Sequence, residues 1–264
     1  TQLKQQQVNP FFDPFWGSFL PYTRTFKVDN MGSGVLMSPD GYIVTNAHVV
    51  DNALEVVVTL PGGKSYDAQV IGIDNNPEMI LHAQQRCTDL PQTKFQEGGA
   101  INLPVEDQTF DAVSCTQVLL YVHEVSSVLK EIQRVLKPGG RVALVETDWR
   151  GVVLNCTDDE LTQSIFSAWD ATVPSPNLPA HLRPLLREHG FSTIRVEAIP
   201  ILNTDYDSGS FSHGIMKWFA KNALKQDAIS EEQAKDWLSD LEQREQSDDF
   251  FFCVNRFLFS AHLK

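Results

Sequence analysis

Residues 110–146 read FDAVSCTQVLLYVHEVSSVLKEIQRVLKPGGRVALVE, and most of the evidence for the fold class lies in this stretch. The apolar run at 110–115 predicts a strand, and apolar residues at helical spacing predict a helix over 125–135. Lys137-Pro138-Gly139-Gly140 ends that helix, and the apolar run at 141–146 predicts the next strand. A strand, a helix and a second strand in this order are typical of a parallel sheet with helical crossovers.

The same alternation continues on both sides of this stretch. Upstream, Asn75 or Asn76 is a suitable N-cap with Pro77 at the first helical position, which predicts a helix over residues 76–87. Downstream, we expect helices at 158–171, 179–189, 212–225 and 230–246, and strands at 193–199 and 250–260. Residues 24–74 differ, because short apolar runs between Pro and Gly turns predict antiparallel strands at 34–37, 42–45, 54–60 and 65–73.

The composition is that of a globular protein and argues against two kinds of partner. The chain has 264 residues, of which 42% are hydrophobic, enough to bury a core. A net charge of -13 argues against a general nucleic-acid surface, and no apolar run is long enough to predict a membrane span. The four cysteines lie far apart after residue 74, so we expect reduced thiols, no metal site and a cytoplasmic location for that part. We identify no signal peptide.

Residues 32–50 read GSGVLMSPDGYIVTNAHVV and resemble the catalytic-histidine segment of the HtrA/Deg family of trypsin-like serine proteases. The resemblance covers residues 24–74 and implies a periplasmic setting for that part. It also implies that His48 is the general base, which needs a serine nucleophile and a carboxylate partner. The family's aspartate is missing from residues 75–80, and the nearest approach to its Gly-x-Ser-Gly-Gly element is Tyr206–Ser210. We therefore expect His48 to be an orphan of an incomplete catalytic set.

From Val70 onwards the chain resembles class I S-adenosylmethionine-dependent methyltransferases, close to the small-molecule type of quinone biosynthesis. Three motifs show the resemblance: VIGIDNNPEM at 70–79, GGAINLPVEDQTFDAV at 98–113 and LKPGGRV at 136–142. The match is good over residues 70–150 and looser to residue 264. The resemblance implies a Rossmann-like, mostly parallel sheet and S-adenosylmethionine as the cofactor.

The same resemblance implies roles for single residues. Asp74 would bind both ribose hydroxyls, because a carboxylate accepts two hydrogen bonds from a diol; a helix-capping acid is the alternative. Met79 would pack on the adenine. Gly99 stands where the family has an aspartate, so the Ala100 backbone N–H would be the remaining contact with the adenine ring. The other cofactor-side residues are Asn75, Cys115, Thr116 and Gln117, and the candidates on the substrate side, for which packed or solvated roles are the alternative, are Tyr121 and His123.

The chain departs from the methyltransferase pattern before Val70. The family's first strand and glycine-rich loop should stand there, and the protease-like strands occupy that place. Gly62 lies too few residues before Asp74 to leave room for a helix and a strand. We therefore predict an α/β sheet without its usual first strand and loop, preceded by a short antiparallel β segment. The predicted division is 1–74 and 75–264, with Val70–Asp74 as a candidate shared strand.

Three functions follow from these resemblances. The leading one is an S-adenosylmethionine-dependent methyltransferase-like protein of small-molecule type, with cofactor binding weakened or lost. The alternative is an inactive chimera, engineered or accidental, and the third is an HtrA-like serine endopeptidase. A small molecule is the expected partner, without nucleic acid or membrane, and the oligomeric state is left open. An apolar substrate or simple core packing would explain the aromatic residues Trp169, Phe211, Trp218 and Phe219.

Overall fold

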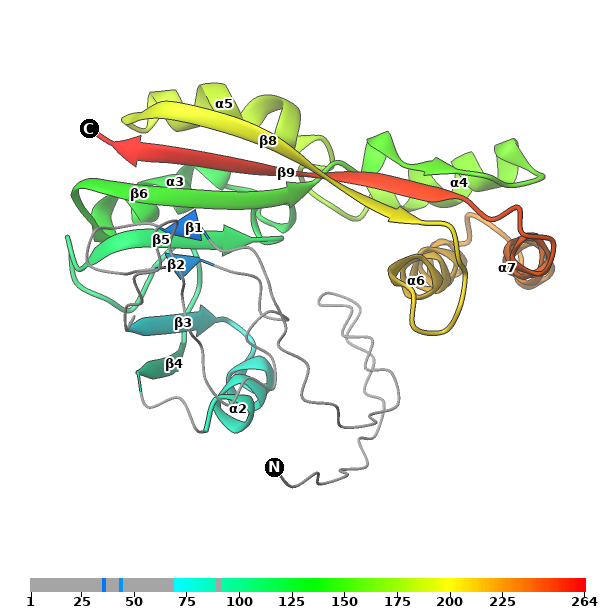
Figure 1. Cartoon of the computed structure of the whole chain (residues 1–264), viewed down its shortest axis with the longest axis horizontal. Helices are drawn as coiled ribbons and strands as arrows, with labels where there is room; N and C mark the ends of the chain where they lie inside the picture. Colours follow the sequence, from blue (N-terminus) through cyan, green and yellow to red (C-terminus); the bar gives the residue numbers. More distant parts are fainter. Residues whose placement is uncertain (1–34, 37–42, 45–68, 89–91) are drawn as a thin grey trace, which may run out of the picture. The chain divides into compact units, whose positions relative to one another are not determined.

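The computed structural model describes residues 35–36, 43–44, 69–88 and 92–264 (Figure 1). His48 and the predicted strand at 54–60 lie outside the described residues, so the predictions about them stay predictions. Strand β1 (Val35–Leu36) pairs in antiparallel fashion with β2 (Ile43–Val44), as the predicted turn between them requires.

The chain folds into two compact units. The first, called the sheet unit, contains the described residues up to Glu146 together with 178–198 and 257–264. The second, called the helical unit, contains 147–177 and 199–256. The predicted boundary at residue 74 rests on family resemblance and stays a prediction.

The sheet unit begins with a parallel pair of strands joined by a helix. Strand β3 (Val70–Asp74) pairs with β4 (Thr93–Glu97), and Asp74 stands opposite Glu97 in the register. Helix α2 (Pro77–Arg86) connects them. The Asn76 side chain caps this helix by accepting a hydrogen bond of 2.9 Å from the Glu78 N–H, which confirms the predicted start.

A second parallel pair follows in the same unit. Strand β5 (Phe110–Thr116) pairs with β6 (Leu136–Thr147), and helix α3 (Val125–Val135) is the crossover between them. The apolar face of α3 is buried, which confirms the predicted helix and its bounds. Strand β6 begins five residues before the predicted start at 141, because Leu136 already pairs with Phe110 ahead of an irregularity in the register.

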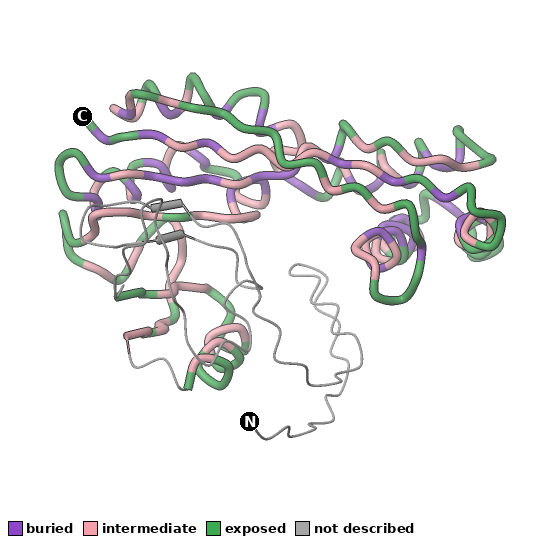
Figure 2. The backbone as a smooth tube through the Cα atoms, viewed as in Figure 1, coloured by how far each residue is buried: buried purple, intermediate pink, exposed green. Residues whose placement is uncertain are grey.

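The two parallel pairs belong to separate sheets. Strands β3 and β4 form a two-stranded sheet, whereas β5 is the edge of a five-stranded sheet, and no described strand joins β3 to β5. Strand β6 is largely buried, but none of the seven residues of β5 is (Figure 2). Six of the seven β5 residues are half-buried and Ser114 is exposed. The predicted lack of a first strand concerns residues before Val70 that lie outside the described ones, so it stays a prediction.

The α/β class and the parallel pairing of β5 with β6 are as predicted. The β3–β4 pair is a correction, because the strand expected at 65–73 was predicted to be antiparallel and no strand was expected at 93–97.

The remaining strands of the five-stranded sheet lie late in the chain. The order is β5-β6-β9-β7, and β8 pairs with β9. Strand β8 (Phe191–Asn203) and strand β9 (Phe252–Leu263) are each longer than predicted, and residues of both units belong to them. Helix α5 (Leu178–Glu188) precedes β8 in the sheet unit.

The helical unit is built around an aromatic core. Its main elements are α4 (Asp159–Asp170), α6 (Phe211–Lys225) and α7 (Glu231–Gln246), with η2 (Trp149–Gly151) and β7 (Val153–Leu154). Trp169 stacks on Phe219 with ring centroids 5.3 Å apart, and Trp149 meets Phe219 edge-on at 5.2 Å. Core packing therefore accounts for Trp169 and Phe219. No helix in the described part of the chain could span a membrane.

Candidate functional site

The carboxyl ends of β3 and β4 bring Asp74 next to the segment Gly98–Ala100. The Gly98 N–H donates a hydrogen bond of 2.9 Å to the Asp74 carbonyl. The Oδ1 atom of Asp74 accepts a hydrogen bond of 2.8 Å from the Asn76 N–H, whereas Oδ2 makes no hydrogen bond with a described residue. One carboxylate oxygen thus holds the turn before α2, and the other is available to a ligand. Asn76 is the N-cap of α2, so the helix-capping alternative for Asp74 is wrong.

Two adjacent glycines follow β4, and the space around the first is crowded whereas the space around the second is open. A Cβ on Gly98 would lie 2.6 Å from Pro104 Cδ and 3.0 Å from Ile73 Cγ2, so only glycine allows this close packing. A Cβ on Gly99 would meet no atom within 4 Å. The space at position 99 is therefore open, and the absence of the family's aspartate there is not imposed by crowding.

A side-chain pair on α3 holds the loop that follows Ala100. The Glu131 carboxylate accepts a hydrogen bond of 2.8 Å from the Leu103 N–H. Arg134 donates to the carbonyls of Leu103 and Val105 and pairs with Asp107 at 2.7 Å. The Arg134 hydrogen bond lowers the pKa of Glu131, and both groups are charged near neutral pH. The loop beside Gly99 is thus fixed by contacts with α3.

The end of β5 contains an unusual backbone conformation. Gln117 has φ of 56°, a region that non-glycine residues rarely adopt. Its N–H donates a hydrogen bond of 2.8 Å to the Val145 carbonyl on β6. Such strain is often found at ligand sites, and the cofactor-side roles of Cys115, Thr116 and Gln117 stay predictions. Burial, with the nearby Glu146 carboxyl, raises the pKa of the Cys115 thiol, so that thiol stays neutral.

Glu146 is a residue of this region that the sequence analysis missed. It lies at the end of β6 and is completely buried. Its Oε1 atom accepts hydrogen bonds from the N–H groups of Val118, at 3.2 Å, and Leu119, at 2.8 Å, whereas Oε2 has no partner among the described residues. Burial raises the pKa of Glu146 to about 8, more than the backbone hydrogen bonds lower it. The only feature of the sequence that could have pointed to Glu146 is its place as an acidic residue at the end of an apolar run.

The predicted site residues fall into two groups, each within the sheet unit. Asp74, Asn75, Gly99 and Ala100 gather at the ends of β3 and β4, with Met79 half-buried on α2. Cys115, Thr116 and Gln117 follow β5. Tyr121 ends the short helix η1 (Leu119–Tyr121) and is half-buried, whereas His123 is exposed. The described residues contain no cluster suited to a metal ion.

Comparison with known families gives a methyltransferase match. Residues 56–144, about a third of the chain, match the family described as "Methyltransferase domain". The matched range begins ahead of β3 and includes Gly62 and Gly63. This part of the chain is therefore methyltransferase-like.

The relatives of this chain include an uncharacterized protein, a methyltransferase and a serine protease. An uncharacterized 37.1 kDa protein in transposon TN4556 of Streptomyces fradiae is 31% identical over 151 residues, covering 57% of this chain and 43% of that protein. Demethylmenaquinone methyltransferase of Bacillus mycoides is 38% identical over 92 residues, or 34% of this chain and 39% of that enzyme. Putative serine protease HhoA of Synechocystis sp. is 38% identical over 101 residues, or 38% of this chain and 25% of that protein. The chain thus spans less than half the length of each.

Proposed function

We propose that this protein is an S-adenosylmethionine-dependent methyltransferase that acts on a small molecule and binds its cofactor weakly. The observation that supports this most is the placement of Asp74 beside Gly98–Ala100, at the carboxyl ends of two parallel strands. A ligand crevice is expected at that edge of an open α/β sheet. The Asp74 Oδ2 atom has no partner among the described residues, and the space beside Gly99 is open, so a nucleoside fits the chemistry of these groups.

Each group has a defined task in this proposal. S-adenosylmethionine supplies a methyl group activated by an adjacent sulfonium. The Asp74 carboxylate binds the ribose diol, and the Ala100 N–H meets the adenine ring. The backbone around Gln117, fixed by its hydrogen bond to Val145, lines the opposite side of the crevice. The protein then contributes mainly by aligning the nucleophilic atom of the substrate with the methyl group, which is a large effect in bimolecular reactions.

Two observations support weak rather than tight cofactor binding. Gly99 offers no side-chain acceptor to the adenine amino group. The Asp74 group and the Gln117 group also stand on sheets that share no described strand. The two groups are joined through the contacts of Glu131 and Arg134 with the loop after Ala100 and not by a shared sheet, so ordering them has an entropic cost that lowers the affinity.

An inactive chimera is the second candidate. Val70 and Ile71 on β3 are 42% and 37% exposed, which is unusual for apolar residues of a parallel strand. Their exposure is expected if the segment that normally covers this strand is missing, and a sheet of this kind would not bind the cofactor. The similarity to demethylmenaquinone methyltransferase favours the active form and a small apolar substrate.

Isothermal titration with S-adenosylhomocysteine separates the two candidates. We expect saturable binding with a Kd on the order of 100 μM, and at least tenfold weaker binding for Asp74→Asn, because a neutral amide cannot accept both hydrogen bonds of a diol. Asn at this position keeps an acceptor for the Asn76 N–H, so the turn is preserved. The matched control is Asp236→Asn on the exposed face of α7. No saturable heat with the unmodified chain would favour the inactive chimera.

Restoring a carboxylate at position 99 should tighten binding. The substitution Gly99→Asp is sterically allowed, and a charged acceptor for the adenine amino group is worth about tenfold in affinity. The same titration measures the gain, with Gly99→Ala as the control for backbone effects. Equal affinities for the two variants would show that the adenine does not lie beside residue 99.

A further inference from the structure

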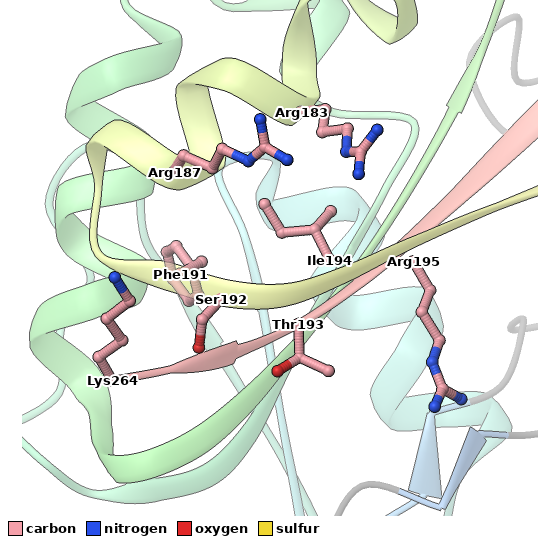
Figure 3. Close-up of a pocket in the computed structure, with 8 residues that line it drawn as sticks. All are labelled: Arg183, Arg187, Phe191, Ser192, Thr193, Ile194, Arg195 and Lys264. Carbon is pink, nitrogen blue, oxygen red and sulfur yellow. The ribbon is translucent and has the colours of Figure 1, made fainter.

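A basic pocket lies in the sheet unit, away from the residues assigned to the nucleoside. It has a volume of about 540 Å³ and lies between α5, the start of β8 and the end of β9. Figure 3 shows Arg183 and Arg187 extending from α5 over β8, on the side of Ile194, whereas Arg195 extends away from them. The eight residues that line it are Arg183, Arg187, Phe191, Ser192, Thr193, Ile194, Arg195 and Lys264.

The charge of this pocket is opposite to that of the whole chain. The chain has a net charge of -13, yet four of the eight lining residues are cationic and none is acidic. Arg183 and Arg187 stand four residues apart on α5 and so project from the same face. The guanidinium groups of Arg183, Arg187 and Arg195 make no hydrogen bond or ion pair with a described residue. No described carboxylate pairs with these guanidinium groups, so they are available to an anionic ligand.

The backbone of the pocket is also unusual. Thr193 has φ of 52° within β8, although β-branched residues rarely adopt this conformation. Ser192 donates its hydroxyl to the His262 carbonyl at 3.3 Å, and this leaves the Ser192 oxygen as an acceptor only. The Thr193 hydroxyl makes no hydrogen bond with a described residue and can donate to a ligand. Strained residues are common at ligand sites, and Figure 3 shows Thr193 on the side of β8 to which Arg195 extends, opposite to Arg183 and Arg187.

We propose that the basic pocket binds a small molecule that bears two phosphate groups. Guanidinium groups match phosphate oxygens in a two-pronged geometry, and two neighbouring arginines suit two such groups. A volume of about 540 Å³ is larger than a single phosphate needs and falls in the range of small-molecule sites. The half-buried Ile194 offers an apolar wall to the rest of the ligand. This proposal does not depend on the methyltransferase function.

Titration with inorganic pyrophosphate tests the proposal on the whole chain. We expect a Kd on the order of 100 μM at low salt, and at least tenfold weaker binding for the double variant Arg183→Gln/Arg187→Gln. Both arginines are exposed, so the substitutions leave the core intact. The matched control is Lys221→Gln/Lys225→Gln on α6, which removes two exposed cations at the same helical spacing outside the pocket. Inorganic phosphate should bind at least tenfold more weakly than pyrophosphate.

Amide chemical shifts of the unmodified chain provide a measurement that needs no variant. Pyrophosphate should shift the amide signals of Ser192, Thr193 and Lys264 with the same saturation curve as the heat. Equal weakening by the two double variants would mean that only overall charge matters, and the proposal would fail. It would also fail if phosphate bound as well as pyrophosphate, or if these amide signals did not move. Unchanged binding of S-adenosylhomocysteine to the arginine variant keeps this test separate from the cofactor test.

Discussion

The free energy of unfolding should fall as the pH rises from about 5 to about 8, and Glu146→Gln should remove much of that fall. The pKa of Glu146 is about 8 in the folded protein because the carboxyl is buried, whereas an exposed glutamate titrates near 4.5. Between these values the folded state keeps a proton that the unfolded state has lost. The contribution of Glu146 to the free energy of unfolding is thus fully present below the pKa of the unfolded state and is lost as the pH rises to 8. The loss is on the order of 1 kcal/mol per pH unit.

Urea denaturation at several pH values measures this slope. His213 acts in the opposite direction, because burial lowers its pKa and its contribution to stability rises with pH. The decisive quantity is therefore the difference between the unmodified chain and Glu146→Gln, which remains neutral throughout. Glu131→Gln is the matched control: the pKa of Glu131 is lowered, so its contribution to stability is lost only as the pH falls through the acid range. Identical slopes for the two variants would contradict the assignment.

Phe219→Ala should cost about 3–5 kcal/mol of the free energy of unfolding, the range seen for large aromatic residues removed from cores. The Phe219 side chain is fully buried and touches the rings of Trp149, Phe166 and Trp169. The cavity left by its removal cannot close easily, because the surrounding rings are themselves held in contact with each other.

Phe251→Ala is the matched control for this prediction. It makes the same chemical change in the same unit at a side chain that is 40% exposed, so we expect a loss below about 1 kcal/mol. Urea denaturation followed by tryptophan fluorescence reports on this unit, because Trp149, Trp169 and Trp237 all lie in it. A loss below about 1 kcal/mol for Phe219→Ala as well would show that the aromatic residues do not form a rigid core.

The local signals of the sequence were sufficient for the helices. The apolar face of Val128, Leu129, Ile132 and Val135 predicts the bounds of α3, because this spacing fits one side of a helix and Lys137-Pro138 cannot continue it. Ser230 and Gln233 form a capping box at the start of α7, where the sequence predicts a helix. These features depend on residues within a few positions of each other.

Features that depend on distant partners were not predictable in this way. Strand β6 extends back to Leu136 only because Phe110 pairs with it. Glu146 becomes notable when the N–H groups of residues 118 and 119 are found on its carboxylate, 28 and 27 positions away. The basic pocket likewise brings Arg183 and Arg187 of α5 together with Lys264 after β9. For the candidate site, family resemblance predicted the residues at the strand ends, and their roles remain predictions.

The separation of the β3–β4 ladder from the β5–β6 ladder has a consequence for binding thermodynamics. Within the described residues, no backbone hydrogen bond runs from one ladder to the other. A nucleoside bound by Asp74 on one side and by the turn at Gln117 on the other would bridge the two pairs of strands. Its association should then be exothermic, with an opposing entropy and a heat-capacity decrease larger than the ligand's own surface explains. Hydrogen exchange at the β3 and β5 amides should slow on ligand addition, even for amides far from the ligand.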